Sequence, residues 1–284
     1  MTTKQTNGKP VLRHIINIWS MVGYPTPKKE WSLERKLRAV KEAGFDGFTT
    51  QLTAAHATLG DKLGLMRLGY FASSKPAEFE KLLRDQKSFG AEHINVQLGD
   101  HDTPTAKAVA MTKRLLWLGA KIGVQPAVEV HRDTCTETPE KTFALADAYK
   151  KETGDLLPMT WDYSHLSVVK HLAPPYWKRL GVRLDLVRRA QQFHFRPFNG
   201  HHCQVPVTNG HGRFTPEFLD YRPFIEEVMR AWLRTAAAGR EMFAVPEMGP
   251  AGSGYNLHSL PNSWEDAKIL RHEIQKCWDR ASKG

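Results

Sequence analysis

Short apolar runs rich in β-branched and aromatic residues alternate along this chain with longer amphipathic stretches. This alternation constrains the fold more than any other feature, because an apolar run followed by a helical pattern is typical of a βα unit, and repeated βα units build a parallel sheet. Eight runs are predicted as strands: His14–Trp19, Gly47–Leu52, Leu68–Ser73, His93–Leu98, Ala127–His131, Met159–Tyr163, Gln192–Phe198 and Phe243–Met248.

Helical patterns fill the intervals between the runs. Several of them stop at a glycine, which favours the left-handed conformation that often follows a helix. Pro139 stands in the first turn of one pattern, where the missing N–H of proline costs nothing. The interval after the second run gives the weakest pattern, because Gly60 and Gly64 interrupt it. The predicted helices are Ser32–Ala43, His56–Met66, Pro76–Phe89, Thr105–Ile122, Pro139–Glu152, Trp177–Gln191, Pro216–Ala238 and Ser263–Ala281.

Strict alternation of eight strands with about eight helices favours a single (β/α)8 TIM barrel over a doubly wound open sheet. The chain has 284 residues, an ordinary length for such a barrel, which typically has about 250. The G-x-G-x-x-G fingerprint of dinucleotide binding is missing after the first run, where Gly23 stands alone. We therefore predict one catalytic barrel domain over 11–284, preceded by a flexible polar leader over 1–10.

Composition excludes several classes of protein. Apolar residues make up 41% of the chain and charged residues 25%, which is typical of a globular domain with a sizeable core. The leader lacks the apolar segment of a secretory signal, and no apolar run approaches the roughly 18–20 residues that span a bilayer. Cys135, Cys203 and Cys277 form no CxxC pair, which argues against a disulfide framework or a cysteine-based zinc site. We predict a cytoplasmic protein with no membrane partner.

An ionisable residue interrupts each of the last four apolar runs near its C-terminal end. These residues are Glu129, Asp162, His194 and Glu247. In a parallel barrel the C-terminal strand ends meet at one mouth, where functional residues gather. Three carboxylates brought together there would repel one another and would be costly to desolvate without a cation. Three hard oxygen ligands and one nitrogen suit one divalent ion, Mn²⁺, Mg²⁺ or Co²⁺, with Zn²⁺ as a further option.

Each of the last four runs ends in a short motif with an ionisable residue. In chain order these motifs are Glu-x-His, Asp-x-x-His, His-x-Arg and a final Pro-Glu. In this order they resemble the xylose isomerase-like TIM-barrel superfamily, which includes sugar phosphate isomerases, ketose 3-epimerases, inosose dehydratases and the AP endonuclease branch of endonuclease IV. The resemblance covers nearly the whole chain. Ala39–Phe48 resembles the family's K-x-x-G-F-D-G entry to the second strand, and Gly210–Phe214 resembles its G-x-G-x-(Ile/Phe) turn after the seventh. Each motif is short, and their order and spacing carry the match.

The resemblance implies a role for each strand-end residue. Glu129, Asp162, His194 and Glu247 would hold the metal ion, and His165 would contact the substrate or a metal ligand. A divalent ion in such a site polarises a carbonyl and stabilises the enediolate that forms beside it. Glu129 and Glu247 would be the catalytic pair, of which one removes a proton from carbon and the other returns one.

Further substrate contacts are predicted where the runs end. Side chains alternate between the two faces of a strand, so His131 lies on the same face as Glu129, and Arg196 on the same face as His194. Arg196 suits an oxyanion, a carboxylate or a phosphate, while a salt bridge to an acidic ligand explains it equally well. His101 follows the fourth run. Trp19 ends the first run and suits stacking on a sugar face.

The net charge of +10 keeps a DNA-repair hydrolase of the endonuclease IV type as an alternative. Those relatives add early-strand ligands for a three-metal site, and His56 and His101 stand near where such ligands would fall. However, Asn209 replaces an aspartate of that branch's Asp-x-His, and a neutral amide is a poorer ligand. The candidate mouth loops are rich in His, Asn, Ser and Gly, which suit polyol hydroxyls better than a phosphate backbone.

We therefore predict a divalent-metal-dependent isomerase or epimerase acting on a sugar, a sugar derivative or a cyclitol by proton abstraction next to a carbonyl. The first alternative is a lyase or dehydratase acting on a keto-sugar or keto-glycoside, because an enediolate can also expel a β-substituent. A small-molecule carbohydrate is favoured over nucleic acid as the partner. Barrels of this size often associate through outer helices, so a homo-oligomer is compatible with the sequence.

Overall fold

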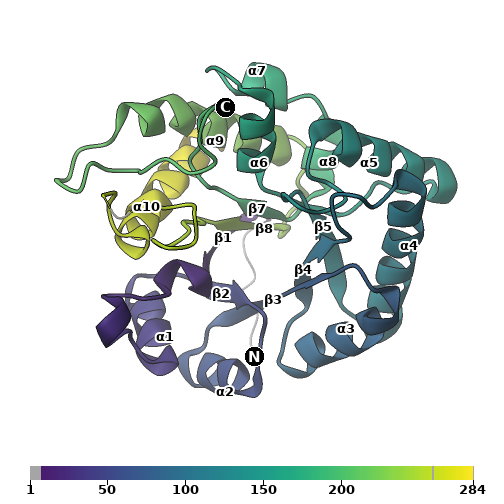
Figure 1. Ribbon diagram of the computed structural model, residues 1–284, viewed down its shortest axis with the longest axis horizontal. Coiled ribbons are helices and arrows are strands. Elements are labelled where there is room, and N and C mark those ends of the chain that lie inside the picture. The colour runs from purple at the N-terminus through teal and green to yellow at the C-terminus, as the bar shows by residue number, and fades with distance from the viewer. Residues whose placement is uncertain (1–7, 258, 284) are drawn as a thin grey trace.

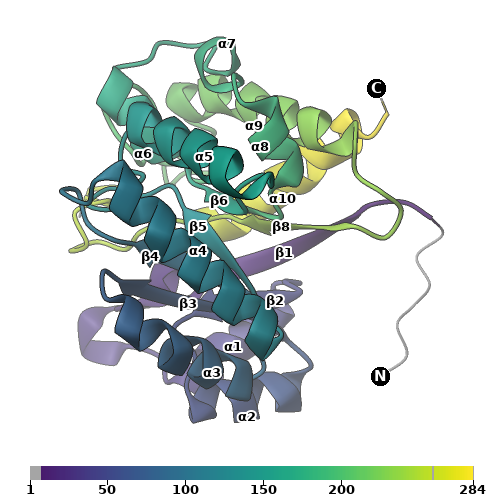
Figure 2. The same ribbon diagram turned by 90° about the vertical axis from the view of Figure 1, so that its right-hand side faces the viewer.

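A closed barrel of eight parallel strands, joined in the order β1 to β8 with β1 beside β8, forms the centre of the molecule. The structure is a computed structural model, and it describes residues 8–257 and 259–283. Most of the leader predicted over 1–10 therefore lies outside the described residues. Figure 1 shows the helices arranged around the strands, with α1–α3 on one side of the barrel and α5–α9 on the other, as Figure 2 also shows from the side. The predicted (β/α)8 fold is confirmed.

Every predicted apolar run coincides with a strand, apart from shifts of a few residues at its ends. The strands are β1 Val11–Asn17, β2 Gly47–Thr50, β3 Met66–Ser73, β4 His93–Leu98, β5 Gln125–Glu129, β6 Met159–Trp161, β7 Gln192–His194 and β8 Glu241–Val245. The last four are shorter at their C-terminal ends than predicted. Because the ladder stops at Trp161, His194 and Val245, several polar residues predicted inside strands lie in the loops that follow.

The helices begin and end largely at the signals that predicted them. Ser32, Thr138 and Asn262 cap three of them by accepting hydrogen bonds from backbone N–H groups of the first turn. The helices are α1 Leu33–Glu42, α2 Ala54–Leu63, α3 Phe79–Ser88, α4 Thr105–Ile122, α5 Pro139–Thr153, α6 Tyr163–Lys170, α7 Trp177–Leu180, α8 Leu184–Arg189, α9 Pro216–Leu233 and α10 Ser263–Ala281. Short 3-10 turns precede α1 and α3 at Pro27–Lys29 and Pro76–Glu78, and another follows β1 at Ile18–Met21.

Three of the helical predictions were wrong in their extent. The helix predicted over Pro216–Ala238 ends at Leu233, five residues before its predicted end. The helix predicted over Trp177–Gln191 is two short helices, because the chain turns at Gly181 against the Trp177 ring. A Cβ at Gly181 would lie 2.6 Å from that ring. The helix predicted over His56–Met66 begins two residues earlier and ends before Gly64, which adopts the left-handed conformation with φ 61°. Met66 then starts β3.

Helix α6 was not predicted at all. It follows β6 directly, and its first five residues are buried, so it shows no amphipathic pattern. Asp162 caps it by accepting a hydrogen bond from Ser164 N at 3.0 Å. His165, predicted in a loop, therefore lies in the first turn of a buried helix.

Apolar side chains fill part of the barrel lumen below its polar mouth. Ile15, Leu68, Phe243 and Val245 form a small buried cluster apart from the large core, in keeping with the layers of inward side chains that fill such barrels. Strand alternation puts the polar strand-end residues above these apolar layers. In the described part of the chain, no helix has the length and apolar character that a membrane crossing requires.

Candidate metal centre

Four buried ionisable side chains meet at the C-terminal mouth of the barrel. Glu129 ends β5, Asp162 directly follows β6, His194 ends β7 and Glu247 lies two residues beyond β8. Each is at most 5% exposed. One potential ligand atom from each lies within 4.8 Å of the others. The structure thus brings together the residues that the sequence singled out, and we call them the ligand cluster.

The spacing within the ligand cluster fits a divalent cation. His194 Nδ1 lies 3.0 Å from Glu129 Oε1 and 2.9 Å from Glu247 Oε2. Although these distances are short, His194 Nδ1 and Asp162 Oδ2 have no hydrogen-bond partner of acceptable geometry. Ligand atoms about 2.1 Å from a common centre and at right angles to one another stand about 3.0 Å apart. The separations of His194 Nδ1 from the two glutamate oxygens are those expected of ligand atoms that share one cation.

Arg196 balances part of the negative charge. Its Nη2 lies 2.7 Å from Glu247 Oε2 and 3.4 Å from Asp162 Oδ2, and its side chain is buried. The three carboxylates and this guanidinium carry a net charge of −2 when His194 is neutral. A divalent cation would neutralise that charge. Of the two roles that the sequence left open for Arg196, the structure shows the salt bridge to acidic ligands.

The charges of the ligand cluster depend on one another. Burial by itself lowers the pKa of His194, but Glu247 and Glu129 outweigh it and raise that pKa well above its ordinary value. Burial by itself raises the pKa of Glu247, but His194 and Arg196 outweigh it and lower the pKa to about 2. Burial likewise disfavours ionisation of Glu129, but His194 lowers its pKa below the ordinary value. Without a cation, a proton on His194 offsets part of the carboxylate charge.

Two asparagines from the first half of the barrel orient the glutamates. Asn17 Nδ2 donates to Glu247 Oε1 at 2.6 Å, and Asn95 Nδ2 donates to Glu129 Oε2 at 2.8 Å. In each case the other carboxylate oxygen is left facing His194. Partners of this kind fix the orientation of metal ligands. Neither asparagine was predicted from the sequence, although each is an inward-facing polar residue in an apolar run.

A cavity of about 340 Å³ opens above the ligand cluster. Three of the predicted substrate contacts, Trp19, His131 and Arg196, line it. Hydroxyl and amide side chains from the early strands line it as well and were not predicted. They are Thr49, Thr50, Gln51, Tyr70 and Gln97. The cavity walls therefore offer many neutral hydrogen-bonding groups.

His165 lies behind the cavity wall. Its ring centroid is 4.3 Å from that of His131, and its Nε2 is 3.4 Å from Asp162 Oδ2. It is 2% exposed and is not among the residues that line the cavity. His131 does face the cavity, and its pKa is lowered by burial, with the Glu129 charge acting in the opposite direction. His165 therefore contacts a predicted ligand, one of the two roles expected for it.

His101 does not reach the cavity. The chain turns after β4 at Gly99, with φ 71°, and Thr103 donates to Asp100 Oδ1 at 2.6 Å to close the turn. The His101 side chain is 57% exposed, and its Nε2 lies 3.5 Å from Asp102 Oδ2. The predicted substrate contact at His101 is not supported by this placement.

Aromatic and cationic groups form one side of the cavity. Tyr255, from the loop after β8, packs edge-on against Trp19 with ring centroids 5.3 Å apart. The guanidinium of Arg196 lies 4.2 Å from the Tyr255 ring centroid, and that of Arg132 lies 4.5 Å from it. Gly249 makes this packing feasible, because a Cβ there would come within 2.6 Å of the Trp19 ring.

The ligand cluster includes no early-strand histidine. Over 8–257 and 259–283, the four residues of the cluster are the only group of three or more His, Cys, Asp or Glu side chains arranged to hold a metal. His56 instead accepts or donates a hydrogen bond with Thr53 Oγ1 at 2.8 Å. This arrangement does not favour the three-metal site of the endonuclease alternative.

No protein-family model matches this chain, and no curated protein matches it in sequence. Solved structures do resemble it. D-allulose 3-epimerase from Methylomonas sp. in complex with D-allulose has 16% identity and a TM-score of 0.57, covering 94% of this chain and 97% of that one. The probable 3-DHS dehydratase involved in petrobactin synthesis from Bacillus anthracis has 18% identity and a TM-score of 0.56, covering 91% and 98%.

A third solved structure was determined with a metal ion. It is a xylose isomerase-like TIM barrel protein from Mycobacterium smegmatis in complex with magnesium, with 16% identity and a TM-score of 0.55, covering 98% of this chain and all of that one. At such identities these likenesses show a shared fold. The shared fold is the (β/α)8 barrel, and one of the proteins that share it is a xylose isomerase-like TIM barrel protein.

Proposed function

We propose that this protein is a divalent-metal-dependent sugar isomerase or epimerase that moves a proton at a carbon next to a carbonyl. The observation that carries the proposal is the ligand cluster: four buried ionisable side chains within 4.8 Å of one another at the barrel mouth. Its net charge, its spacing and its orphaned polar atoms all suit one divalent ion. The cavity above it is large enough for a small polyol.

Glu129, Asp162, His194 and Glu247 would hold the ion, which would be Mn²⁺, Mg²⁺ or Co²⁺, with Zn²⁺ as a further option. When bound, the ion would polarise a substrate carbonyl and stabilise the negative charge that develops there. The magnesium found in the Mycobacterium smegmatis protein supports a divalent ion in a barrel of this fold.

Glu129 and Glu247 would move the proton. They come from β5 and β8, which are separated around the barrel by β6 and β7, so they approach a bound substrate from different sides. The lowered pKa of each keeps it ionised near neutral pH and able to act as a base. Removal of a proton by one carboxylate and return by the other would invert a carbon centre or shift a carbonyl.

The substrate class follows from the cavity walls. Tyr70 donates to Gln97 Oε1 at 2.9 Å, and both line the cavity beside neutral hydroxyl and amide groups. Trp19 and Tyr255 add aromatic surface on another side. Hydroxyl-binding groups beside aromatic faces suit a sugar, a sugar derivative or a cyclitol. The D-allulose bound by the Methylomonas epimerase supports a carbohydrate of this size.

A lyase or dehydratase is the second candidate, because it begins with the same proton abstraction. His131, which lines the cavity two residues beyond Glu129, would protonate the leaving oxygen. The probable dehydratase among the similar structures supports this candidate. A DNA-repair hydrolase is less favoured, because most cavity-lining groups are neutral and the described cluster provides for one ion.

Metal analysis of the purified protein tests the site. Wild type should hold one divalent ion per chain, and Glu129→Gln, Asp162→Asn and Glu247→Gln should each lose it. Unchanged metal content in all three variants would contradict the proposed centre.

Solvent-deuterium incorporation into a panel of ketoses, keto-glycosides and inososes tests the reaction. Deuterium at a carbon of an otherwise intact sugar supports isomerisation or epimerisation, and loss of a β-substituent supports the second candidate. Cleavage of abasic DNA without any exchange into sugars would refute both.

A further inference from the structure

Gln192 is a buried polar residue that the reaction proposed above does not use. It begins β7, two residues before His194, so both side chains face the barrel lumen and Gln192 lies one layer deeper. Its Nε2 is 2.8 Å from His194 Nε2. Gln192 is only 4% exposed. Among the described residues, His194 is the one partner to which the Gln192 side chain is hydrogen-bonded.

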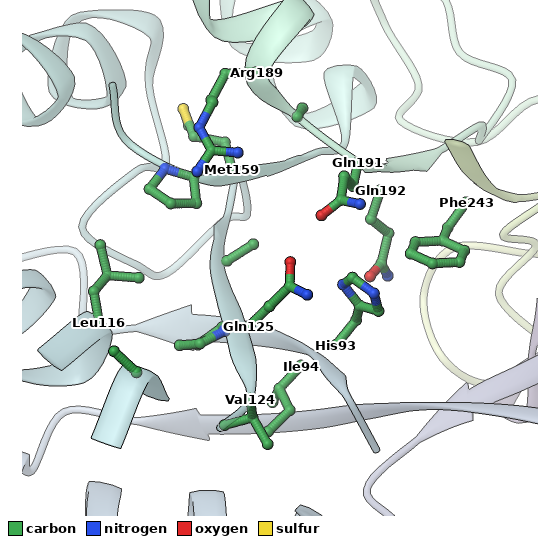
Figure 3. A pocket seen from close by; sticks show the side chains of 15 residues that line it. His93, Ile94, Leu116, Val124, Gln125, Met159, Arg189, Gln191, Gln192 and Phe243 are labelled. Carbon is green, nitrogen blue, oxygen red and sulfur yellow. The ribbon is translucent and has the colours of Figure 1, made fainter. Parts of the chain in front are cut away.

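On its other side, Gln192 borders a second cavity, of about 280 Å³, at the N-terminal end of the barrel. Figure 3 shows Gln192 there near His93 and Phe243, with Gln125 across the cavity. Beside Gln192 in the barrel lumen, Phe243 belongs to the buried apolar cluster that also includes Ile15 and Leu68. Burying an amide there costs free energy unless it is hydrogen-bonded. The hydrogen bond to His194 therefore compensates the burial of the Gln192 amide and links this amide to the ligand cluster.

The contact acts on the nitrogen of His194 that faces away from the ligand cluster. A neutral imidazole carries its proton on one nitrogen and a lone pair on the other, and the partner of one nitrogen selects the state of the other. A carboxamide can present either its NH₂ or, after a half-turn, its oxygen at the same place. In this structure the NH₂ faces Nε2, and when that nitrogen carries a proton, the half-turned amide accepts the hydrogen bond through its oxygen.

Resting on the proposed metal site, we propose that Gln192 is a positioning residue for that site. When the ion is bound, the Gln192 amide presents its oxygen to a proton on His194 Nε2. That hydrogen bond leaves Nδ1 unprotonated and available as a ligand beside Glu129 Oε1 and Glu247 Oε2, the two atoms that lie 3.0 and 2.9 Å from it. Gln192 thus selects the tautomer that can bind a metal and holds the ring in place.

Co²⁺ binding to the purified full-length protein tests this role. Gln192→Met keeps the length of the side chain and removes its acceptor oxygen, and Gln192→Glu keeps an acceptor. Gln125→Met is the matched control, because Gln125 lines the same cavity and is outside the ligand cluster. Calorimetry gives the Kd, the visible d–d spectrum reports the ligands, and thermal unfolding in EDTA compares the folded states of the metal-free variants.

We expect Gln192→Met to raise the Kd for Co²⁺ by about 10- to 100-fold and to shift the d–d spectrum, as removal of partners of metal ligands does. Gln192→Glu should restore most of the affinity, and Gln125→Met should match wild type. Wild-type affinity and spectrum in folded Gln192→Met would overturn the positioning role while leaving the metal site intact. A wild type that binds no Co²⁺ would instead refute the proposed function.

A measurement on wild type alone decides the matter if Gln192→Met does not fold. Nitrogen-15 spectra of the Zn²⁺-loaded protein, with the His194 signals identified by comparison with His194→Gln, show which ring nitrogen carries the proton. We expect a hydrogen-bonded proton on Nε2 and the metal on Nδ1. The reverse assignment would overturn the proposal.

Discussion

Replacing Arg196 by methionine should destabilise the metal-free protein and, at the same time, strengthen its metal binding. The Arg196 guanidinium is buried and lies 2.7 Å from Glu247 Oε2 and 3.4 Å from Asp162 Oδ2. Removal of one partner from a buried ion pair costs about 3–5 kcal/mol, because the other charge stays buried without compensation. For a chain of this size each kcal/mol lowers the melting temperature by about 2–4 °C, so we expect a fall of roughly 6–20 °C in EDTA.

The same substitution removes one positive charge beside the ligand cluster. The Arg196 guanidinium repels a bound cation. At a distance of about 4 Å and an effective dielectric constant of 20, this repulsion is about 4 kcal/mol for each unit of charge on the cation, and the substitution removes it. An affinity for Co²⁺ at least tenfold higher, equivalent to about 1.4 kcal/mol, is thus a conservative expectation. The two effects have opposite directions, which distinguishes electrostatics from a general loss of structure.

Differential scanning calorimetry with and without Co²⁺ measures both effects. Arg132→Met is the matched control, because Arg132 lies over the same Tyr255 ring but is exposed, and it should change the melting temperature by no more than a few degrees. An unchanged melting temperature of Arg196→Met in EDTA, or weaker Co²⁺ binding by the folded variant, would refute the charge balance described for the cluster.

Three further outcomes are expected. Glu129→Gln should slow deuterium exchange into the accepted sugar by about 10²- to 10⁴-fold, and exchange at the wild-type rate would exclude Glu129 as a base or ligand. The pKa of His194 is raised above its ordinary value, so at a pH below that pKa an ion must displace a proton from His194. The Kd for Co²⁺ should therefore fall about tenfold for each unit of rising pH and level off above the pKa. A Kd independent of pH would contradict this competition. Gln86 is buried and pairs with the backbone of Leu52 at 2.9 and 3.4 Å, so Gln86→Leu should lower the free energy of unfolding in urea by about 1–3 kcal/mol, and an unchanged value would show that Leu52 finds another partner.

The strands and the ligand cluster could be predicted because both depend on local signals. Apolar runs bounded by helix stops mark the strands, and an ionisable residue in such a run is conspicuous because burial of a charge is costly. Glu129, Asp162, His194 and Glu247 each stand in that position, and the shared direction of parallel strands implies that they meet. Their side-chain orientations could not be predicted in this way, because these depend on partners from other strands.

The residues that were missed or misplaced depend on tertiary structure. The role of Asn17 and Asn95 can be recognised only once their glutamate partners are known to lie beside them. These partners are separated from them in the sequence, by 230 positions in the case of Asn17 and Glu247. Helix α6 is buried over its first turns and so lacks the alternation of faces that marks a surface helix. His101 follows a strand as predicted, but a local turn directs it into solvent. Sequence position specifies the strand end, and loop geometry decides whether the next side chain reaches the mouth.

The pairing of β1 with β8 determines when the ligand cluster can assemble during synthesis of the chain. Asn17, at the end of the first strand, holds Glu247, which lies beyond the last one. A chain still growing on the ribosome therefore lacks one proposed ligand, which is also the partner of Asn17, until Glu247 has been added. The proposed metal site cannot form before β8 and the loop after it have been made, so capture of an ion there should report that the first and last strands have joined.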